Sequence, residues 1–375
     1  MTLAFISCVP GLESVLAKEV ETLGFTPSIV RAGVEINIKE FSDIYRLNFL
    51  LRTCSRVLLL MKEFNCTTPN DLYENILDID WAPYFQGLPT LAIDTTVLHN
   101  PNFTNTLFAS QKAKDAICDR LRKSFGERPS VDTARPDLHF VLFIEGKKAK
   151  FYFDTSGTPL HVRGYRDVTS KAPLRENLAA GLLLLTSFSK DNVLLDPCCG
   201  AGTFLVEAAL IASNTPPGYL RKTYGFMKHP EYSSHEWKKI HQEHMDARIP
   251  LKKESIFGVE KSSTAYTQLA KVLYASGFEK DISVSCRDFR TYKVPETVDF
   301  LITNPPYGVR LQDDYLEDLY KELGDFFKHI PHKPSKGCIF TAQSNLIKKI
   351  GLKTSKRHII SNGGIDCRLL EFDLY

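Results

Sequence analysis

Residues 193–203 read VLLDPCCGAGT, a continuous apolar run that ends in an acid and a proline and then turns through two glycines. Such a run is typical of a strand buried on both faces of a sheet, and the following GTFLVEAALIAS has the spacing of a helix. A strand that passes through a Gly-x-Gly turn into a helix is typical of a doubly wound sheet, in which ligands bind at the carboxyl ends of the strands.

The rest of the carboxyl-terminal half repeats this alternation of strand and helix. Apolar strands are expected in ESIFGVE (254–260), ISVSCRDF (282–289), VDFLITNPPY (298–307) and KGCIFTAQ (336–343), with helices between them. This pattern predicts a parallel sheet covered on both faces. Residues 358–375, which contain Asn362-Gly363-Gly364, predict a final antiparallel hairpin.

The amino-terminal half has a different, mixed character. Residues 1–41 predict one α+β module and residues 42–155 a second. Residues 156–172, rich in glycine, proline and charge, predict a linker. Residues 173–375 are then the parallel-sheet domain, interrupted by a basic insertion at 219–253.

Composition excludes several classes of protein. The chain has 375 residues, 43% hydrophobic and 24% charged, so it is neither disordered nor collagen-like. The longest apolar stretch, about residues 178–185, is too short for a bilayer, and the first residues lack the basic start of a signal peptide. Nine scattered cysteines without a CxxC pair predict a cytosolic protein with reduced thiols and no zinc.

Three acids follow three successive predicted strands: Asp196, Glu260 and Asp288. Glu260 could accept hydrogen bonds from both hydroxyls of a ribose, and Asp288 from an adenine amine. Each acid alone could be an ordinary surface carboxylate, but three at equivalent positions favour a nucleoside site. A nicotinamide dinucleotide fits poorly, because Leu205 replaces the third glycine and Glu260 follows Gly202 by 58 residues.

The stretch LITNPPYG (301–308) contains the candidate catalytic residues. Asn304 has a side-chain carbonyl, and Pro306 holds the residue before it extended, so the carbonyl of Pro305 is fixed as well. Two rigid acceptors can grip the two hydrogens of a planar amino group, and Tyr307 offers a face for stacking a base. The alternative is a proline turn that merely ends a strand.

The order DPCCGAGT, Glu260, Asp288 and NPPYG resembles the class I S-adenosylmethionine-dependent amino-group methyltransferases. In that family a seven-stranded sheet ends in an antiparallel hairpin. SGTPLHVRGYRD and KAPLRENLAA are similar to RNA methyltransferases with an amino-terminal THUMP domain. PGLESVLAKEV, LRTCSRVLLLMKEF, DLYENILDIDW, KAKDAICDRLR and GERPSVD match best the bacterial 23S rRNA guanine methyltransferases of the RlmL type.

The resemblance implies a ferredoxin-like module at 1–41, a THUMP RNA-binding domain at 42–155 and transfer of a methyl group to the 2-amino group of a guanine. Asn304, Pro305, Pro306 and Tyr307 would form the catalytic site. Glu260 would hold the ribose of the cofactor and Asp288 its adenine. The other implied cofactor contacts are Pro173, Leu174, Glu176, Asp196, Pro197, Cys199, Gly200 and Gly202.

RNA is the expected partner. Seven basic and two acidic residues lie between Lys147 and Arg175, and Lys147, Lys148, Arg163 and Arg166 are the expected contacts. The insertion at 219–253 either grips RNA or is a solvated helical excursion. The chain is expected to be a cytoplasmic monomer without metal.

Three other functions stay open at this point. The same chemistry could act on a tRNA guanine, because THUMP enzymes with NPPY-type sites serve both substrates. A DNA adenine-amino methyltransferase shares the acceptor motif, although the THUMP-like half argues against it. A non-catalytic RNA-binding protein with a decayed core is disfavoured by the intact motif residues.

Overall fold

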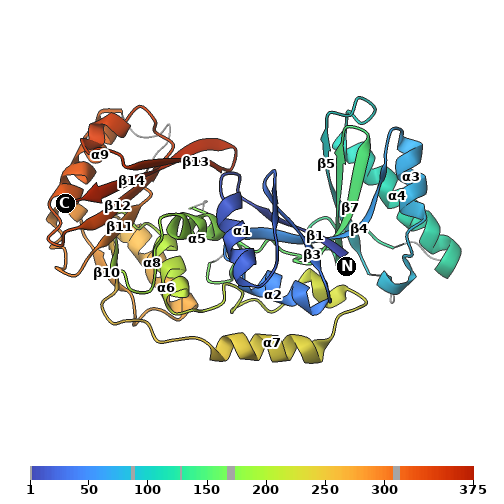
Figure 1. Cartoon of the computed structure of the whole chain (residues 1–375), viewed down its shortest axis with the longest axis horizontal. Helices are drawn as coiled ribbons and strands as arrows, with labels where there is room; N and C mark the ends of the chain where they lie inside the picture. Colours follow the sequence, from blue (N-terminus) through green and yellow to red (C-terminus); the bar gives the residue numbers. More distant parts are fainter. Residues whose placement is uncertain (1, 86–88, 127–128, 167–173, 307–312) are drawn as a thin grey trace.

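The computed structural model describes residues 2–85, 89–126, 129–166, 174–306 and 313–375. Two seven-stranded sheets follow one another along an elongated molecule (Figure 1). Within the described residues, no helix is long and apolar enough to cross a membrane.

The amino-terminal sheet has the strand order β2-β3-β1-β4-β7-β6-β5. Its strands are β1 (Thr2–Cys8), β2 (Ser28–Val30), β3 (Gly33–Ile38), β4 (Cys54–Asn65), β5 (Leu91–Leu98), β6 (Leu138–Glu145) and β7 (Lys148–Asp154). The 12-residue strand β4 is shared, because residues 54–59 pair with β1 and residues 58–65 pair with β7. The sheet therefore runs without a break through the expected module boundary after residue 41.

The α-helices of this half are α1 (Glu13–Thr22), α2 (Ser42–Leu50), α3 (Pro69–Leu77) and α4 (Thr106–Phe125). Thr68 caps α3 by accepting a hydrogen bond from the backbone N–H of Asp71, whose carboxylate accepts in return from the backbone of Thr68. The helices α3 and α4 pack on each other and on β5–β7 around a separate apolar core that contains Trp81 and Phe140.

The carboxyl-terminal sheet has the order β10-β9-β8-β11-β12-β14-β13. Its strands are β8 (Leu194–Asp196), β9 (Ile256–Glu260), β10 (Ser283–Cys286), β11 (Phe300–Thr303), β12 (Ser335–Thr341), β13 (Lys356–Asn362) and β14 (Ile365–Leu374). β14 runs antiparallel to both of its neighbours, and the remaining strands are parallel. The expected parallel sheet with a final hairpin is confirmed.

The helices of this domain are α5 (Glu176–Leu185), α6 (Thr203–Ala212), α7 (Ser234–Asp246), α8 (Ser263–Ser276) and α9 (Asp313–Lys328). Most residues of α5 and α6 are buried, as expected of apolar helices that lie between a sheet and another part of the molecule.

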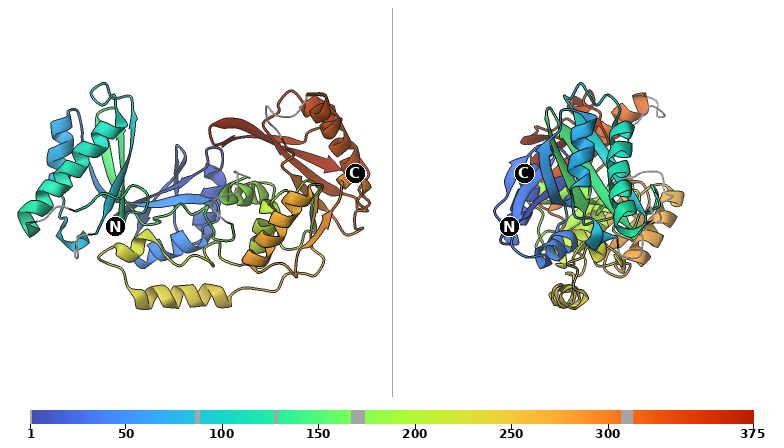
Figure 2. Two further views of the ribbon diagram at one scale, coloured as in Figure 1. Left: turned by 180° about the vertical axis from the view of Figure 1, so that it is seen from behind. Right: turned by 90° about the vertical axis from the view of Figure 1, so that its right-hand side faces the viewer.

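The insertion at 219–253 crosses back to the amino-terminal half. Its helix α7 lies beneath α2 at the edge of the molecule (Figures 1 and 2). Trp237 of α7 is 8% exposed and packs edge-on against Phe49 of α2, with ring centroids 5.3 Å apart. The hydroxyl of Tyr45 accepts a hydrogen bond from the backbone N–H of Ser233, 2.7 Å away, at the start of the helix. The insertion therefore ties the two halves together.

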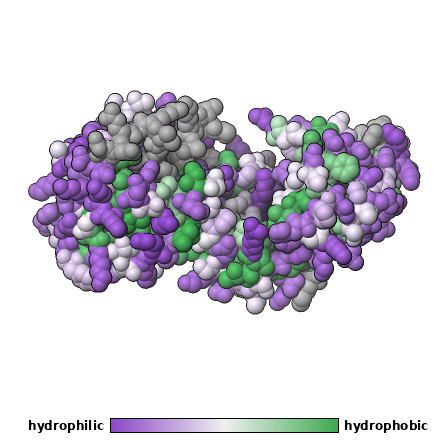
Figure 3. All heavy atoms as spheres, turned by 90° about the horizontal axis from the view of Figure 1, so that it is seen from above, coloured by the Kyte–Doolittle hydropathy of each residue, from purple (hydrophilic) through white to green (hydrophobic). Residues whose placement is uncertain are grey.

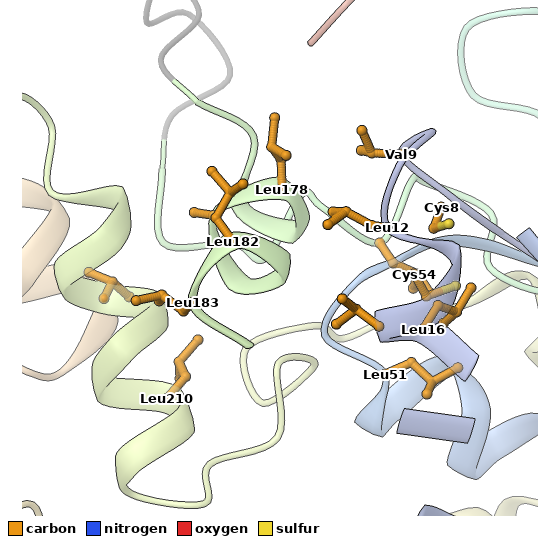
Figure 4. Close-up of a cluster of buried hydrophobic side chains, with 14 of the residues drawn as sticks. Cys8, Val9, Leu12, Leu16, Leu51, Cys54, Leu178, Leu182, Leu183 and Leu210 are labelled. Carbon is orange, nitrogen blue, oxygen red and sulfur yellow. The ribbon is translucent and has the colours of Figure 1, made fainter. Parts of the chain in front are cut away.

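A continuous apolar core also joins the two halves. Figure 4 shows Leu12, which directly precedes α1, between that helix and Leu178 of α5, and Leu12, Leu16, Leu178 and Leu182 belong to one cluster. A Cβ on Gly181 would lie 2.4 Å from a methyl group of Leu12, so this glycine lets α1 and α5 approach closely. On the face shown in Figure 3, by contrast, hydrophilic side chains predominate and apolar ones gather in small patches.

Candidate functional site at the carboxyl edge of the parallel sheet

The acids predicted from the sequence meet at one edge of the carboxyl-terminal sheet. In the parallel register Asp196 of β8 stands beside Gly258 of β9, and Glu260 of β9 stands beside Cys286 of β10. Because β11 is parallel to β8, Asn304 leaves the sheet at the same edge. This edge is where ligands bind in doubly wound folds.

The turn between β8 and α6 leaves backbone exposed at this edge. Gly200 has a φ of +52°, and a Cβ added to it would meet nothing within 4 Å. Gly202 has a φ of +77°, and its Cβ would lie 2.3 Å from a methyl group of Leu269. Pro197 is buried, and Cys199 is 6% exposed. Gly200 is thus the residue of the turn that faces open space.

The carboxylate of Glu260 links this turn to the residues that follow β9. One carboxylate oxygen accepts from the backbone N–H of Gly200 at 3.0 Å, and the second accepts from that of Ser262 at 2.7 Å. The backbone N–H of Cys199 donates to the carbonyl of Val259 at 3.0 Å. The glycine turn and the end of β9 are therefore held as one unit.

Asp196 is buried at the floor of this edge, 2% exposed. Its Oδ1 accepts from the backbone N–H of Cys198 at 3.0 Å. Burial raises the pKa of Asp196 to about 7, which outweighs the lowering effect of the hydrogen bond from the Cys198 N–H, and the nearby Glu260 charge adds to the rise. The group therefore titrates near neutral pH.

The carboxylate of Asp288, which was expected to accept a hydrogen bond from adenine, is already bonded to basic side chains of the protein. Its carboxylate bonds Arg290 through Nε at 2.8 Å and Nη2 at 2.5 Å, and Lys261 Nζ lies 3.0 Å away. The hydrogen bonds from Arg290 hold the pKa of Asp288 well below its usual range. An amine ligand would have to share this carboxylate with two cations. Sequence reasoning missed both partners, although each stands within two residues of a predicted site acid.

Asn304 follows the last residue of β11 and carries an unusual feature. Its side-chain Oδ1 is buried, and no residue in the described part of the chain donates a hydrogen bond to it. Buried carbonyls almost always have a partner. Pro305 is buried and Pro306 exposed. Tyr307, expected to stack on a base, lies outside the described residues.

The segment before α5 lies against the start of α6. Leu174 is 5% and Glu176 7% exposed. Arg166 donates from Nη1 to the carbonyl of Leu174 at 3.3 Å, lies 3.5 Å from the Glu176 carboxylate and bonds the hydroxyl of Thr203. Burial raises the pKa of Glu176, against the opposing effect of Arg166. Pro173, the other predicted contact here, lies outside the described residues.

Two of the four predicted RNA contacts, Arg163 and Arg166, are largely buried. Arg163 is 2% exposed, and its guanidinium donates to the carbonyls of Leu160 and Arg52 and to Glu207. Arg166 has a side chain only 10% exposed, because it is bound to α5 and α6 as described above. Both arginines have partners inside the protein, which their expected role as RNA contacts did not include.

The other two predicted contacts are exposed. Lys147 and Lys148 lie at the turn between β6 and β7. Lys148 Nζ lies 3.6 Å from the carboxylate of Glu63, with both side chains largely solvated. Such a surface pair is weak and can open toward another anion.

The strand order and the reversed β14 define the Rossmann-like fold of class I methyltransferases. The family model described as "RMKL-like, methyltransferase domain" matches residues 163–371, and the chain belongs to this family. A THUMP domain model matches residues 66–154, and an RlmL ferredoxin-like domain model matches residues 4–58.

Curated relatives agree with this assignment. The chain is 33% identical over 377 residues to a protein of Pseudomonas savastanoi pv. phaseolicola named ribosomal RNA large subunit methyltransferase K/L. It is 33% identical over 382 residues to a protein of the same name from Syntrophotalea carbinolica. These alignments cover 98% and 99% of this chain but 50% and 53% of the relatives. The chain thus spans about half the length of these curated relatives.

Solved structures match along the whole chain. A protein described as "SMU.472, a putative methyltransferase complexed with SAH" superposes with a TM-score of 0.90 at 25% identity, covering 100% of this chain and 98% of the other. A protein of Clostridium difficile 630 described as a possible methylase gives 0.89 at 29% identity, with the same coverage. The arrangement of both halves of the molecule is therefore shared with these proteins.

Proposed function

We propose that the chain transfers a methyl group from S-adenosylmethionine to the exocyclic 2-amino group of a guanine in 23S rRNA. The observation that carries this proposal is the buried Oδ1 of Asn304, an acceptor without a donor among the described residues, at the edge that also carries the glycine turn. A substrate amino group would supply the missing donor.

The residues of this edge fit the proposed cofactor. Gly200 leaves open space beside the turn, and the carboxylate of Glu260, fixed by two backbone N–H groups, is positioned to hold a ribose. Asp288 would face the adenine, and Asp196, Pro197, Cys199 and Gly202 would line the turn. Leu174 and Glu176 would close the site from the start of α5. When bound, the cofactor supplies an electrophilic methyl group on a positively charged sulfur.

Asn304 and Pro305 would orient the amino group. Their carbonyls would accept its two hydrogens, so that the nitrogen lone pair points at the methyl carbon. Held in this way, the nitrogen would receive the methyl group that the bound cofactor supplies, the sulfur would keep the electron pair of the broken carbon–sulfur bond, and the nitrogen would then release one proton to water. No strong general base is required, because the methylated nitrogen is acidic until the proton leaves.

The choice of 23S rRNA rests on the relatives' names and on the THUMP match. Lys147 and Lys148 are the proposed RNA contacts that are exposed. A tRNA guanine is the second candidate substrate. A DNA adenine is the third, since one matching structure, from Listeria monocytogenes, is described as a predicted N6-adenine-specific DNA methylase, with a TM-score of 0.87 at 25% identity. We further propose that the enzyme acts as a cytoplasmic monomer without a metal ion.

Nucleoside analysis tests the proposal. The purified chain and S-adenosylmethionine are incubated separately with deproteinised 23S rRNA, total tRNA and duplex DNA, and the digested nucleosides are resolved by mass spectrometry. We expect N(2)-methylguanosine in the rRNA alone. The same nucleoside in tRNA alone would overturn the substrate, and N6-methyladenine in DNA would overturn the target base.

A further inference from the structure

A groove of about 670 Å³ lies along α7, on the insertion that ties the two halves of the molecule together. Its lining includes Arg221, Lys222, His235, Trp237, Lys238 and Lys239. In the part of the chain that the structure describes, no acidic residue lines it. We call it the α7 groove.

None of its three lysine side chains is paired with a carboxylate of the described residues. Lys222, Lys238 and Lys239 are exposed, and none of their side chains forms a hydrogen bond or an ion pair with a described residue. Elsewhere on the surface, by contrast, lysines do find carboxylates: Lys261 lies 3.0 Å from Asp288 and Lys328 lies 2.9 Å from Asp325. The positive potential of the α7 groove is therefore available to an external anion.

The floor of the α7 groove is rigid. Arg221 donates to the carbonyls of Ser156, Thr158 and Pro159 at 2.6–3.0 Å, and its guanidinium lies 4.9 Å from the centroid of the Tyr224 ring. Because these partners are carbonyls and a ring, no carboxylate of the described residues pairs with Arg221 at contact distance. Trp237 is fixed against α2. These contacts fix the position of the α7 groove relative to both halves of the molecule.

We propose that the α7 groove binds the sugar-phosphate backbone of the RNA substrate. This inference rests on the proposed function and adds a second point of attachment, on a different element from Lys147 and Lys148. Phosphate contacts fix the register of a nucleic acid without reading its sequence. Since α7 contacts α2 of the amino-terminal half, RNA held there would keep one position relative to both sheets.

The lining argues for a nucleic acid over an acidic protein. Protein interfaces draw most of their affinity from buried aromatic or apolar anchors. The aromatic side chain of the α7 groove, Trp237, is only 8% exposed and already packed against Phe49. What the groove offers an incoming molecule is chiefly charge, which suits a chain of phosphates.

Salt-dependent binding of purified 23S rRNA tests this site. The groove variant K222E/K238E/K239E is compared with the control K190E/K271E/K280E, which reverses three other exposed lysines and changes the net charge equally. At 100 mM KCl we expect the groove variant to bind at least about tenfold more weakly than wild type. Its slope of log affinity against log salt should fall by about 2 to 3, as expected on losing three phosphate contacts, and the control should match wild type.

Two results would overturn the proposal. Equal losses in the groove variant and the control would mean that only net charge matters. Tighter binding of poly-L-glutamate than of RNA to the wild-type groove, lost in the groove variant, would assign the site to an acidic protein. Calorimetry with SAH checks that both variants keep a folded cofactor site. If the wild type methylates no nucleic acid, the proposed function is wrong. That result comes from the methylation assay and does not depend on the RNA affinities measured here.

Discussion

At the scale of single residues, the two glycines after β8 both have a positive φ, but they differ in what a side chain would meet there. Gly202 is required by packing, because any Cβ would collide with Leu269. Gly200 meets nothing, so its bare backbone leaves room for a ligand. A substitution at Gly200 should therefore affect binding more than folding.

Gly200→Ala tests this distinction. A positive φ costs alanine about 1 kcal/mol of stability, and the new methyl group would enter the space assigned to the cofactor. We expect the affinity for SAH, measured by calorimetry, to fall by about tenfold or more, a change of ~1.4 kcal/mol in binding free energy. Gly277→Ala is the matched control, since Gly277 has a φ of +75° and nothing within 4 Å but caps α8. Unchanged SAH affinity in Gly200→Ala would contradict the site.

Asp196 predicts a pH dependence of cofactor binding. Because burial raises its pKa to about 7, the carboxyl is largely protonated at pH 6 and ionised at pH 8. An ionised Asp196 would attract the ammonium group of the cofactor, so SAH affinity should rise between these pH values. Asp196→Asn should bind more weakly at pH 8 and lose this rise. A rise of equal size in the variant would assign the titration to another group.

The burial of Arg163 could not be predicted from the sequence. Counting charges between residues 147 and 175 could not separate exposed Lys147 from buried Arg163, because both add the same charge to a patch. The partners of Arg163, Glu207 and the carbonyl of Arg52, lie 44 and 111 positions away. Burial of a cation depends on such distant partners, which no local pattern reveals.

At the scale of elements, strands and helices followed from local patterns. The continuous apolar runs predicted the parallel strands, and Gly363-Gly364 marked the hairpin between β13 and β14. The sharing of β4 was not predictable, because one strand pairs with β1 along one half and with β7 along the other. The packing of α7 under α2 was equally hidden, since Trp237 finds Phe49 across the sequence.

His139 on β6 gives a prediction for the amino-terminal sheet. Burial alone would lower its pKa, but Asp154 at 2.8 Å and Asp94 at 3.0 Å outweigh burial and raise the pKa to about 9. The resulting stabilisation is fully present below the ordinary pKa of 6.5 and is lost as the pH rises through 9. We expect His139→Asn to remove about 2–3 kcal/mol of unfolding free energy at pH 6 and little at pH 10.

Urea unfolding of wild type and variant at both pH values checks this prediction. The difference between the two proteins should shrink as the pH rises. A difference independent of pH would show that His139 acts through packing instead of charge.

At the scale of the whole molecule, the two sheets share one apolar core through α1 and α5. Leu12, 0% exposed, lies against Gly181 in this joint. Leu12→Ala should cost about 3 kcal/mol of unfolding free energy, as cavity-forming substitutions do. Leu107→Ala, at a residue 61% exposed on α4, should change it by less than about 0.5 kcal/mol. Equal effects by urea unfolding would mean that the joint is not well packed.

The central claim is that Asn304 presents an amino group of RNA to the cofactor, and one measurement tests it most directly. Single-turnover transfer from S-adenosylmethionine to 23S rRNA, read as N(2)-methylguanosine, is compared for wild type and Asn304→Ala, with SAH affinity measured on the same samples. We expect transfer by the wild type and a loss of at least about a hundredfold in the variant, as for other groups that position reactants. The SAH affinity of the two proteins should be nearly equal. Loss of SAH affinity in parallel with transfer, or full transfer by the variant, would contradict it.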